Sequence, residues 1–184
     1  MSGEFWTRLS VWMALVGYLA GPLAALLGRQ HPTWQRAARA IYTAGLLFFL
    51  AHVALAFHVF YDWSHIIALR ETARETLEVT GRQSGAGLYL NYLFTLLWIV
   101  DALWWWRRPE SFERRNPWIA VTLHGFMLFM AFNATVVFEE GAVRWAGVLG
   151  TVLLVTALVP ALVQAAKSRG ARAQRASGSG TLVP

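Results

Sequence analysis

The chain has 184 residues, of which 57% are hydrophobic and 14% are charged, with a formal net charge of +6 and no cysteine. A typical soluble domain carries roughly 25% charged residues, so this composition excludes an ordinary water-soluble surface and predicts a lipid-facing one. The lack of cysteine excludes disulfides, thiolate metal sites and cysteine nucleophiles. The basic residues lie in short clusters between apolar segments, which indicates membrane topology signals, and we expect no nucleic-acid binding.

Five apolar segments follow one another along the chain, and each approaches the roughly 20 residues that a helix needs to cross a bilayer. The sequence predicts an all-α, polytopic integral membrane protein, a bundle formed by one domain over residues 1–176. Its five transmembrane helices are expected at residues 9–28, 40–61, 87–106, 116–138 and 145–166. Residues 177–184, with the sequence SGSGTLVP, are interpreted as a linker and tag remnant outside this domain.

Positive charge is unevenly divided between the two ends of these predicted helices. The first, third and last connections carry eleven of the 16 Lys and Arg residues. Because positive residues favour the cytoplasmic side, we expect the N-terminus outside and the C-terminus in the cytoplasm of a bacterial inner membrane. Membrane lipids are the expected partners. Small residues four apart, such as Gly17 and Gly21, suit helix packing within the chain, in a homo-oligomer or in a larger membrane complex.

The longest connection joins the second and third predicted spans, over residues 62–86. Its first part contains strong helix formers and reaches a plausible helix stop at Thr80–Gly81. We therefore expect one of two arrangements. Either the second spanning helix continues past the membrane, or a separate short helix lies on the outer surface.

A candidate metal site lies at the outer end of the second span. His58, Asp62 and His65 have spacings of four and three, so on a continuous helix they would lie within roughly 60° of one another. Glu139 and Glu140 end the fourth span on the same side and would complete the ligand set. Imidazole and carboxylate suit Zn, Fe, Cu or Mn, and a metal here would polarise a substrate or activate water. A hydrated polar helix end explains the same residues without metal.

Further polar residues fall inside the predicted spans. Asn91 and Asn133 lie on the metal-site side, where they would support the ligands. Asp101 is a carboxylate within the bilayer, where such groups usually face a partner or water. His124 lies at the same depth in the next span, which predicts a contact between the two. That contact would serve as a proton relay or ligand orienter, or as a structural pair that fixes helix packing.

Haem b is a second possible cofactor. Two of His52, His58 and His124 would hold it as axial ligands between helices, in an electron carrier. His52 points about 120° away from His58 on their helix, so it is not part of the metal set. A single histidine bonded to a neighbouring helix explains His52 equally well.

Three broader functions stay open on the sequence: a metal-dependent membrane enzyme with unknown catalytic residues, a transporter or proton-coupled channel, and a structural subunit of a membrane complex. A transport function would place Asp101 and His124 on the path. The sequence lacks the internal repeat and the paired helix breaks of many transporters, since Pro22 and Pro160 are isolated.

Overall fold

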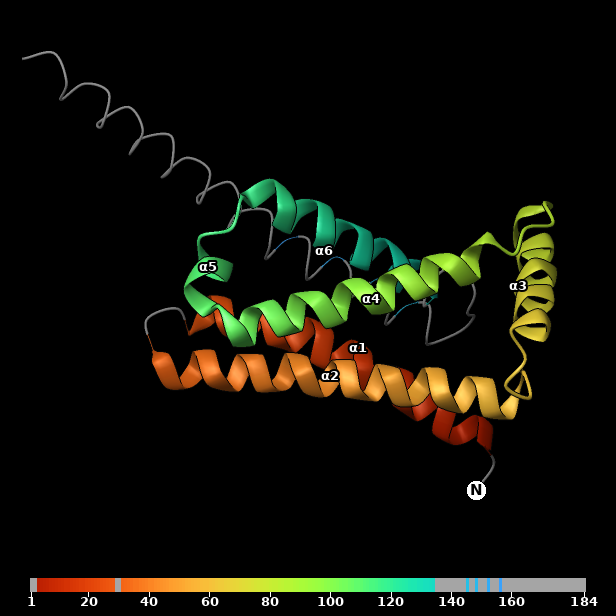
Figure 1. Ribbon diagram of the computed structural model, residues 1–184, viewed down its shortest axis with the longest axis horizontal. Coiled ribbons are helices and arrows are strands. Elements are labelled where there is room, and N and C mark those ends of the chain that lie inside the picture. The colour runs from red at the N-terminus through yellow and green to blue at the C-terminus, as the bar shows by residue number, and fades with distance from the viewer. Residues whose placement is uncertain are drawn as a thin grey trace, which may run out of the picture.

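The computed structural model describes residues 3–28 and 31–134, together with the single positions 145, 148, 152 and 156. Within this part of the chain the protein is all-helical with no strand, which confirms the all-α part of the predicted fold class (Figure 1). The helices are α1 (Gly3–Leu27), α2 (Pro32–Val59), α3 (His65–Thr80), α4 (Ala86–Arg107), α5 (Pro109–Glu113) and α6 (Pro117–Phe132).

Three of the described helices, α1, α2 and α4, are long and apolar enough to cross a membrane. α6 is also apolar but shorter, and it covers the first part of the predicted span 116–138. The predicted fifth span lies outside the described residues, except for four helical positions at residues 145, 148, 152 and 156. The chain is therefore membrane-integral by composition and length, while the number of spans stays a prediction.

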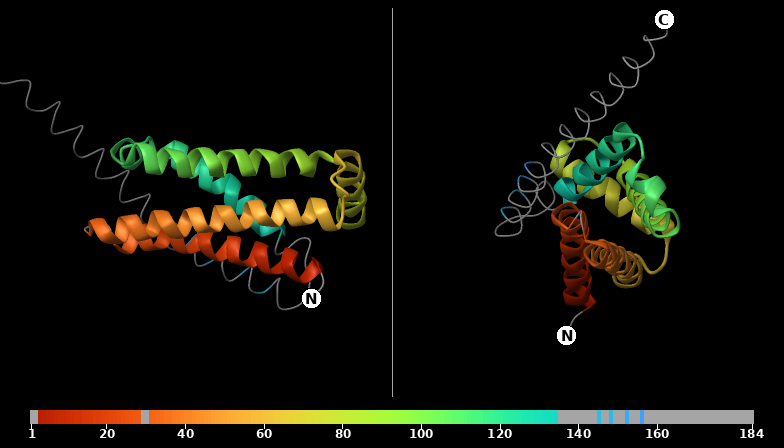
Figure 2. Two further views of the ribbon diagram at one scale, coloured as in Figure 1. Left: turned by 60° about the horizontal axis from the view of Figure 1, so that its bottom comes forward. Right: turned by 90° about the vertical axis from the view of Figure 1, so that its left-hand side faces the viewer.

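α1 and α2 run side by side and approach each other unusually closely (Figures 1 and 2). Gly17 and Gly45 make this possible, because a Cβ atom built on Gly17 would lie 2.5 Å from the Gly45 Cα atom. Gly21 lies against Tyr42 in the same interface, where an added Cβ would come within 2.7 Å of the tyrosine Cβ. Small residues at a membrane helix interface let backbones meet, which increases van der Waals contact.

The connection between α2 and α4 turns a sharp corner. α2 ends at Val59, and Asp62 and Trp63 have positive φ angles of 47° and 56°. Ser64 then caps a separate helix, α3, which lies across the end of the bundle (Figure 2). The expectation of a separate short helix is confirmed, and the expectation that the second spanning helix continues is wrong. Two left-handed residues in succession cannot belong to a right-handed helix.

The bundle core consists largely of aromatic side chains. Trp98 of α4 is 1% exposed and lies at its centre, with ring contacts to Tyr18, Tyr42, Phe49 and Phe94. These rings come from α1, α2 and α4, so the core joins all three long helices. This aromatic core surrounds the polar groups described next.

Candidate functional site

Asp101 faces the aromatic core because of its position in the helical repeat of α4. The buried residues Phe94, Trp98, Asp101 and Trp105 recur at spacings of four, three and four, which places them on one helix face. This face packs inward, so the carboxylate enters the bundle together with three large rings. Only 1% of the Asp101 side chain is exposed.

Two groups from other elements bind the Asp101 carboxylate. The Tyr42 hydroxyl of α2 donates a hydrogen bond to Oδ2 at 3.0 Å. The Arg115 guanidinium donates to Oδ1 through Nη1 at 2.6 Å and forms an ion pair. Each carboxylate oxygen therefore has a donor, as a buried charge requires.

Arg115 reaches the carboxylate from the short connection between α5 and α6. Its guanidinium carbon lies 3.9 Å from the centre of the Phe112 ring, and this ring in turn stacks on Trp105 at 5.0 Å. Asn116 follows immediately and caps α6 by accepting a hydrogen bond from the Trp118 N–H at 3.0 Å. The cap fixes the start of α6, and with it the point from which Arg115 enters. The arginine side chain is 10% exposed.

His124 of α6 lies on the other side of the same guanidinium. Its Nε2 atom is 3.0 Å from Arg115 Nη2, and its Nδ1 atom is 3.4 Å from the Tyr18 hydroxyl. A guanidinium has donors only, so Nε2 must accept. We assign His124 as the neutral tautomer, with the proton on Nδ1 directed toward Tyr18.

Five side chains thus form one connected group, called here the ionic cluster: Tyr18, Tyr42, Asp101, Arg115 and His124. The predicted partnership of Asp101 and His124 is realised through Arg115, which bridges them, rather than by a direct hydrogen bond. The Trp98 indole N–H beside the cluster is buried and has no acceptor among the described residues. A buried donor of this kind is a natural point for a water molecule to join a polar cluster.

The structure does not gather the predicted metal ligands. His58, Asp62 and His65 are all exposed, and the corner between α2 and α3 removes the shared helix face on which their grouping depended. The His65 Nδ1 atom lies 3.0 Å from the Tyr92 hydroxyl instead. Among the described residues, no three His, Asp or Glu side chains form a group that suits a metal ion. Glu139 and Glu140 lie outside the described residues.

The remaining predicted site residues have local partners. His52 Nδ1 lies 2.9 Å from the carbonyl oxygen of Thr7 in α1, which matches the simpler interpretation of this histidine. Asn133, the C-cap residue of α6, donates to the Phe129 carbonyl at 2.7 Å, and Asn91 is exposed.

The haem hypothesis requires two histidines that face one space. A chain of ring contacts runs from His52 through Phe49, Trp98 and Tyr18 to His124, so aromatic side chains lie between these two histidines. Both nitrogens of His124 already face partners. Haem ligation stays a prediction from the sequence, and no contact in the described part of the chain adds support to it.

Sequence reasoning missed Arg115, Tyr18 and Tyr42. Arg115 lies in the arginine-rich connection between the third and fourth predicted spans, and the positive-inside rule alone explains why that connection is basic. One signal was available: an intramembrane carboxylate needs a positive partner, and Arg115 belongs to the group of arginines in the connection that follows Asp101.

Comparison with protein-family models, with curated proteins and with solved structures finds no match to this chain. The chain's own residues are therefore the basis for a functional proposal.

Proposed function

We propose that the protein is a proton-coupled membrane transport protein in which His124 of the ionic cluster accepts the proton. One observation carries this proposal: the Arg115 guanidinium lies between Asp101 and His124 inside the bundle. Ionisable side chains within membrane helices are costly and commonly mark proton or substrate pathways.

The hydrogen bonds make protonation of His124 and its contact with Arg115 mutually exclusive. Neutral His124 accepts from the guanidinium through Nε2. Protonated His124 would present a second donor and a second positive charge to Arg115 at the same point. The two groups must then separate, while Asp101 attracts both cations. Proton uptake is thereby coupled to movement of Arg115.

Access to the cluster differs between the two ends of the bundle. Arg115 enters from the end that carries α5, opposite the end covered by α3 (Figure 1). We propose that the α5 end faces the cytoplasm, in agreement with its many arginines. Toward the α3 end the Phe49 and Phe94 rings pack against Trp98, so apolar side chains lie between the cluster and His52.

Proton movement is the direct test. The purified protein is reconstituted into liposomes containing a pH-sensitive dye, and the decay of an imposed pH gradient is followed. We expect wild-type protein to accelerate the decay, and His124→Gln to return it to the rate of protein-free liposomes. His65→Gln removes an exposed histidine outside the cluster and serves as the matched control with wild-type flux. A folded wild-type protein that gives no flux above protein-free liposomes would show that the cluster is structural.

The coupling of proton uptake to Arg115 is tested separately. The chain has no cysteine, so Arg114→Cys introduces a single attachment point for a spin label beside Arg115. Lowering the pH from about 8 to below the usual histidine range should increase the mobility of the label. In a background of His124→Gln the mobility should not respond to pH. An equal response in both backgrounds would contradict the coupling.

A further inference from the structure

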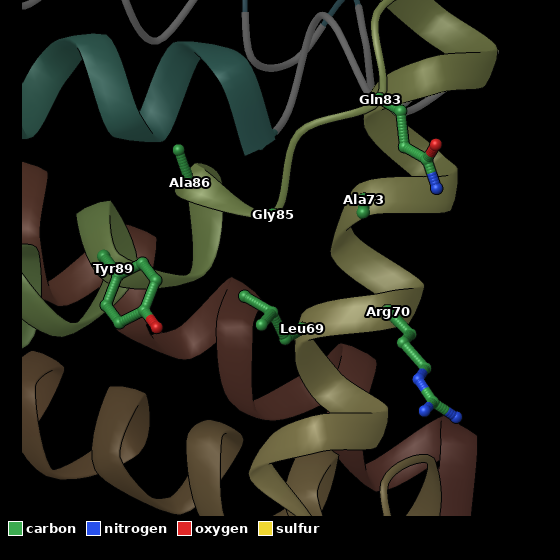
Figure 3. A pocket seen from close by; sticks show the side chains of 7 residues that line it. All are labelled: Leu69, Arg70, Ala73, Gln83, Gly85, Ala86 and Tyr89. Atoms are coloured by element: carbon green, nitrogen blue, oxygen red, sulfur yellow. The ribbon is translucent and has the colours of Figure 1, made fainter.

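A pocket of about 480 Å³ lies at the end of the bundle opposite α5, between α3 and the beginning of α4 (Figure 1). Figure 3 shows its walls, which consist of the side chains or backbone of Leu69, Arg70, Ala73, Gln83, Gly85, Ala86 and Tyr89. Its lining is mainly apolar, whereas its margin carries an arginine and a glutamine. An apolar interior with a cationic margin suits an amphiphile with an anionic head.

Close contacts between α3 and the first turn of α4 fix one wall of the pocket. Gly85 packs so closely on α3 that an added Cβ atom would lie 2.6 Å from Leu69 Cδ1 and 3.0 Å from the Leu69 carbonyl oxygen. Gly87 lies against Thr72 in the same way, at 3.2 Å. The first turn of α4 is therefore fixed against α3. The space between them is part of the fold.

The surface around the pocket is suited to lipid. Ile66, Leu69, Ala73 and Leu77 recur at spacings of three and four, so they form an apolar strip along one side of α3. Ile66 is 61% exposed and Leu77 is 44% exposed. α4 is long and apolar enough to span the membrane and begins at Ala86, which places the pocket where such a helix leaves the hydrocarbon. An amphipathic helix with this strip lies in the interfacial region of a bilayer.

Arg70 supplies the charge that selects the head group. Its neighbour Arg74, one turn later, is neutralised by ion pairs to Glu71 at 2.8 Å and Glu78 at 3.0 Å. Among the described residues, no carboxylate forms an ion pair with Arg70. Its guanidinium points out of the pocket in Figure 3, away from Leu69 and Tyr89, and the residue is exposed. A guanidinium can bind two phosphate oxygens at once through bidentate hydrogen bonds.

We propose that this pocket binds an anionic phospholipid of the surrounding bilayer. An acyl chain and the glycerol region lie against Leu69, Ala73 and the Tyr89 ring, and Arg70 binds the phosphate. Tyr89 is 56% exposed and lies at the level where tyrosine commonly anchors membrane proteins. The proposal is independent of the ionic cluster, which lies near the other end of the bundle.

The test counts lipids retained by the full-length protein in native mass spectrometry, after purification with added phosphatidylglycerol or phosphatidylcholine. We expect wild-type protein to retain phosphatidylglycerol, and Arg70→Gln to retain one molecule fewer with roughly fivefold weaker apparent affinity. Ala73→Phe, which fills the pocket, should lose the same molecule. Arg74→Gln is the matched control and should bind as wild type, because its arginine is already paired within α3.

Three results would overturn the proposal. Arg70→Gln could retain as much phosphatidylglycerol as the wild type. The wild type and Arg70→Gln could retain phosphatidylcholine as well as phosphatidylglycerol, which would show that the charge of the head group does not affect binding. Inorganic phosphate could displace the lipid signal at Arg70, which would indicate a site for a soluble anion. Arg70 is exposed, so its substitution tests the site even if Ala73→Phe does not fold.

Discussion

Replacing Arg115 by glutamine is expected to destabilise the folded protein by about 3–5 kcal/mol, the usual cost of breaking a buried ion pair from one side. The change leaves the Asp101 carboxylate, 1% exposed, with Tyr42 as its remaining hydrogen-bond donor among the described residues. The carboxylate must then become protonated or draw water into the bundle, and either response costs free energy. Thermal unfolding in detergent should show a midpoint lowered by roughly 10 °C.

Arg114→Gln is the matched control for this experiment. Arg114 is adjacent in the sequence and exposed, so its loss should change stability by less than about 0.5 kcal/mol. The double variant Asp101→Asn with Arg115→Gln removes both charges and should be less destabilised than the sum of the single variants. Equal effects of Arg114→Gln and Arg115→Gln would show that the buried ion pair does not contribute to stability.

A second large effect is expected at the closest contact between α1 and α2. Gly17→Ala should destabilise the protein by about 3 kcal/mol, at the upper end of the range for over-packing. The added methyl group would lie 2.5 Å from the Gly45 Cα atom and 2.7 Å from its backbone nitrogen. Backbone cannot move aside as a flexible side chain can, so the two helices must separate. Unfolding by denaturing detergent would measure the loss.

Gly125→Ala provides the matched control for the same substitution type. Gly125 lies within α6, and no described atom lies within 4 Å of the position that its Cβ atom would occupy. Alanine there should stabilise the protein by roughly 0.5–1 kcal/mol, because glycine weakens a helix interior. If both variants were stabilised alike, the close approach of α1 and α2 would be contradicted.

The three long helices α1, α2 and α4 could be predicted from hydropathy, but their ends could not all be placed. The predicted span 87–106 differs from α4 by one residue at each end. The predicted span 40–61 differs more, because α2 begins at Pro32, eight residues earlier. Gln35, Arg36 and Arg39 lie in this additional part and interrupt the apolar pattern without interrupting the helix. Hydropathy reports where a helix meets lipid, whereas the helix itself continues into the interface.

The candidate site could be predicted only in part. Equal depth in neighbouring helices associated Asp101 with His124, because depth follows directly from residue count, but the structure joins the two through Arg115 and not by the predicted direct contact. The predicted grouping of the metal ligands His58, Asp62 and His65 required one continuous helix through Asp62. The backbone at Asp62 is left-handed, so the helix ends before these side chains can share a face. Tyr18 and Tyr42 had no distinguishing pattern. Their roles depend on which faces of α1 and α2 meet α4, and this is a property of tertiary packing.

The separation of Asp101 and Arg115 along the chain has a consequence for biosynthesis. The carboxylate lies in α4, and its positive partner follows 14 residues later, after the helix has ended. During insertion into the membrane, α4 alone carries an uncompensated charge, at a cost of up to about 3 kcal/mol. That cost is offset only when the ribosome has delivered Arg115 and α6 can dock. α4 and α6 are therefore expected to leave the translocon as a hairpin, with the ion pair formed before either helix meets lipid by itself.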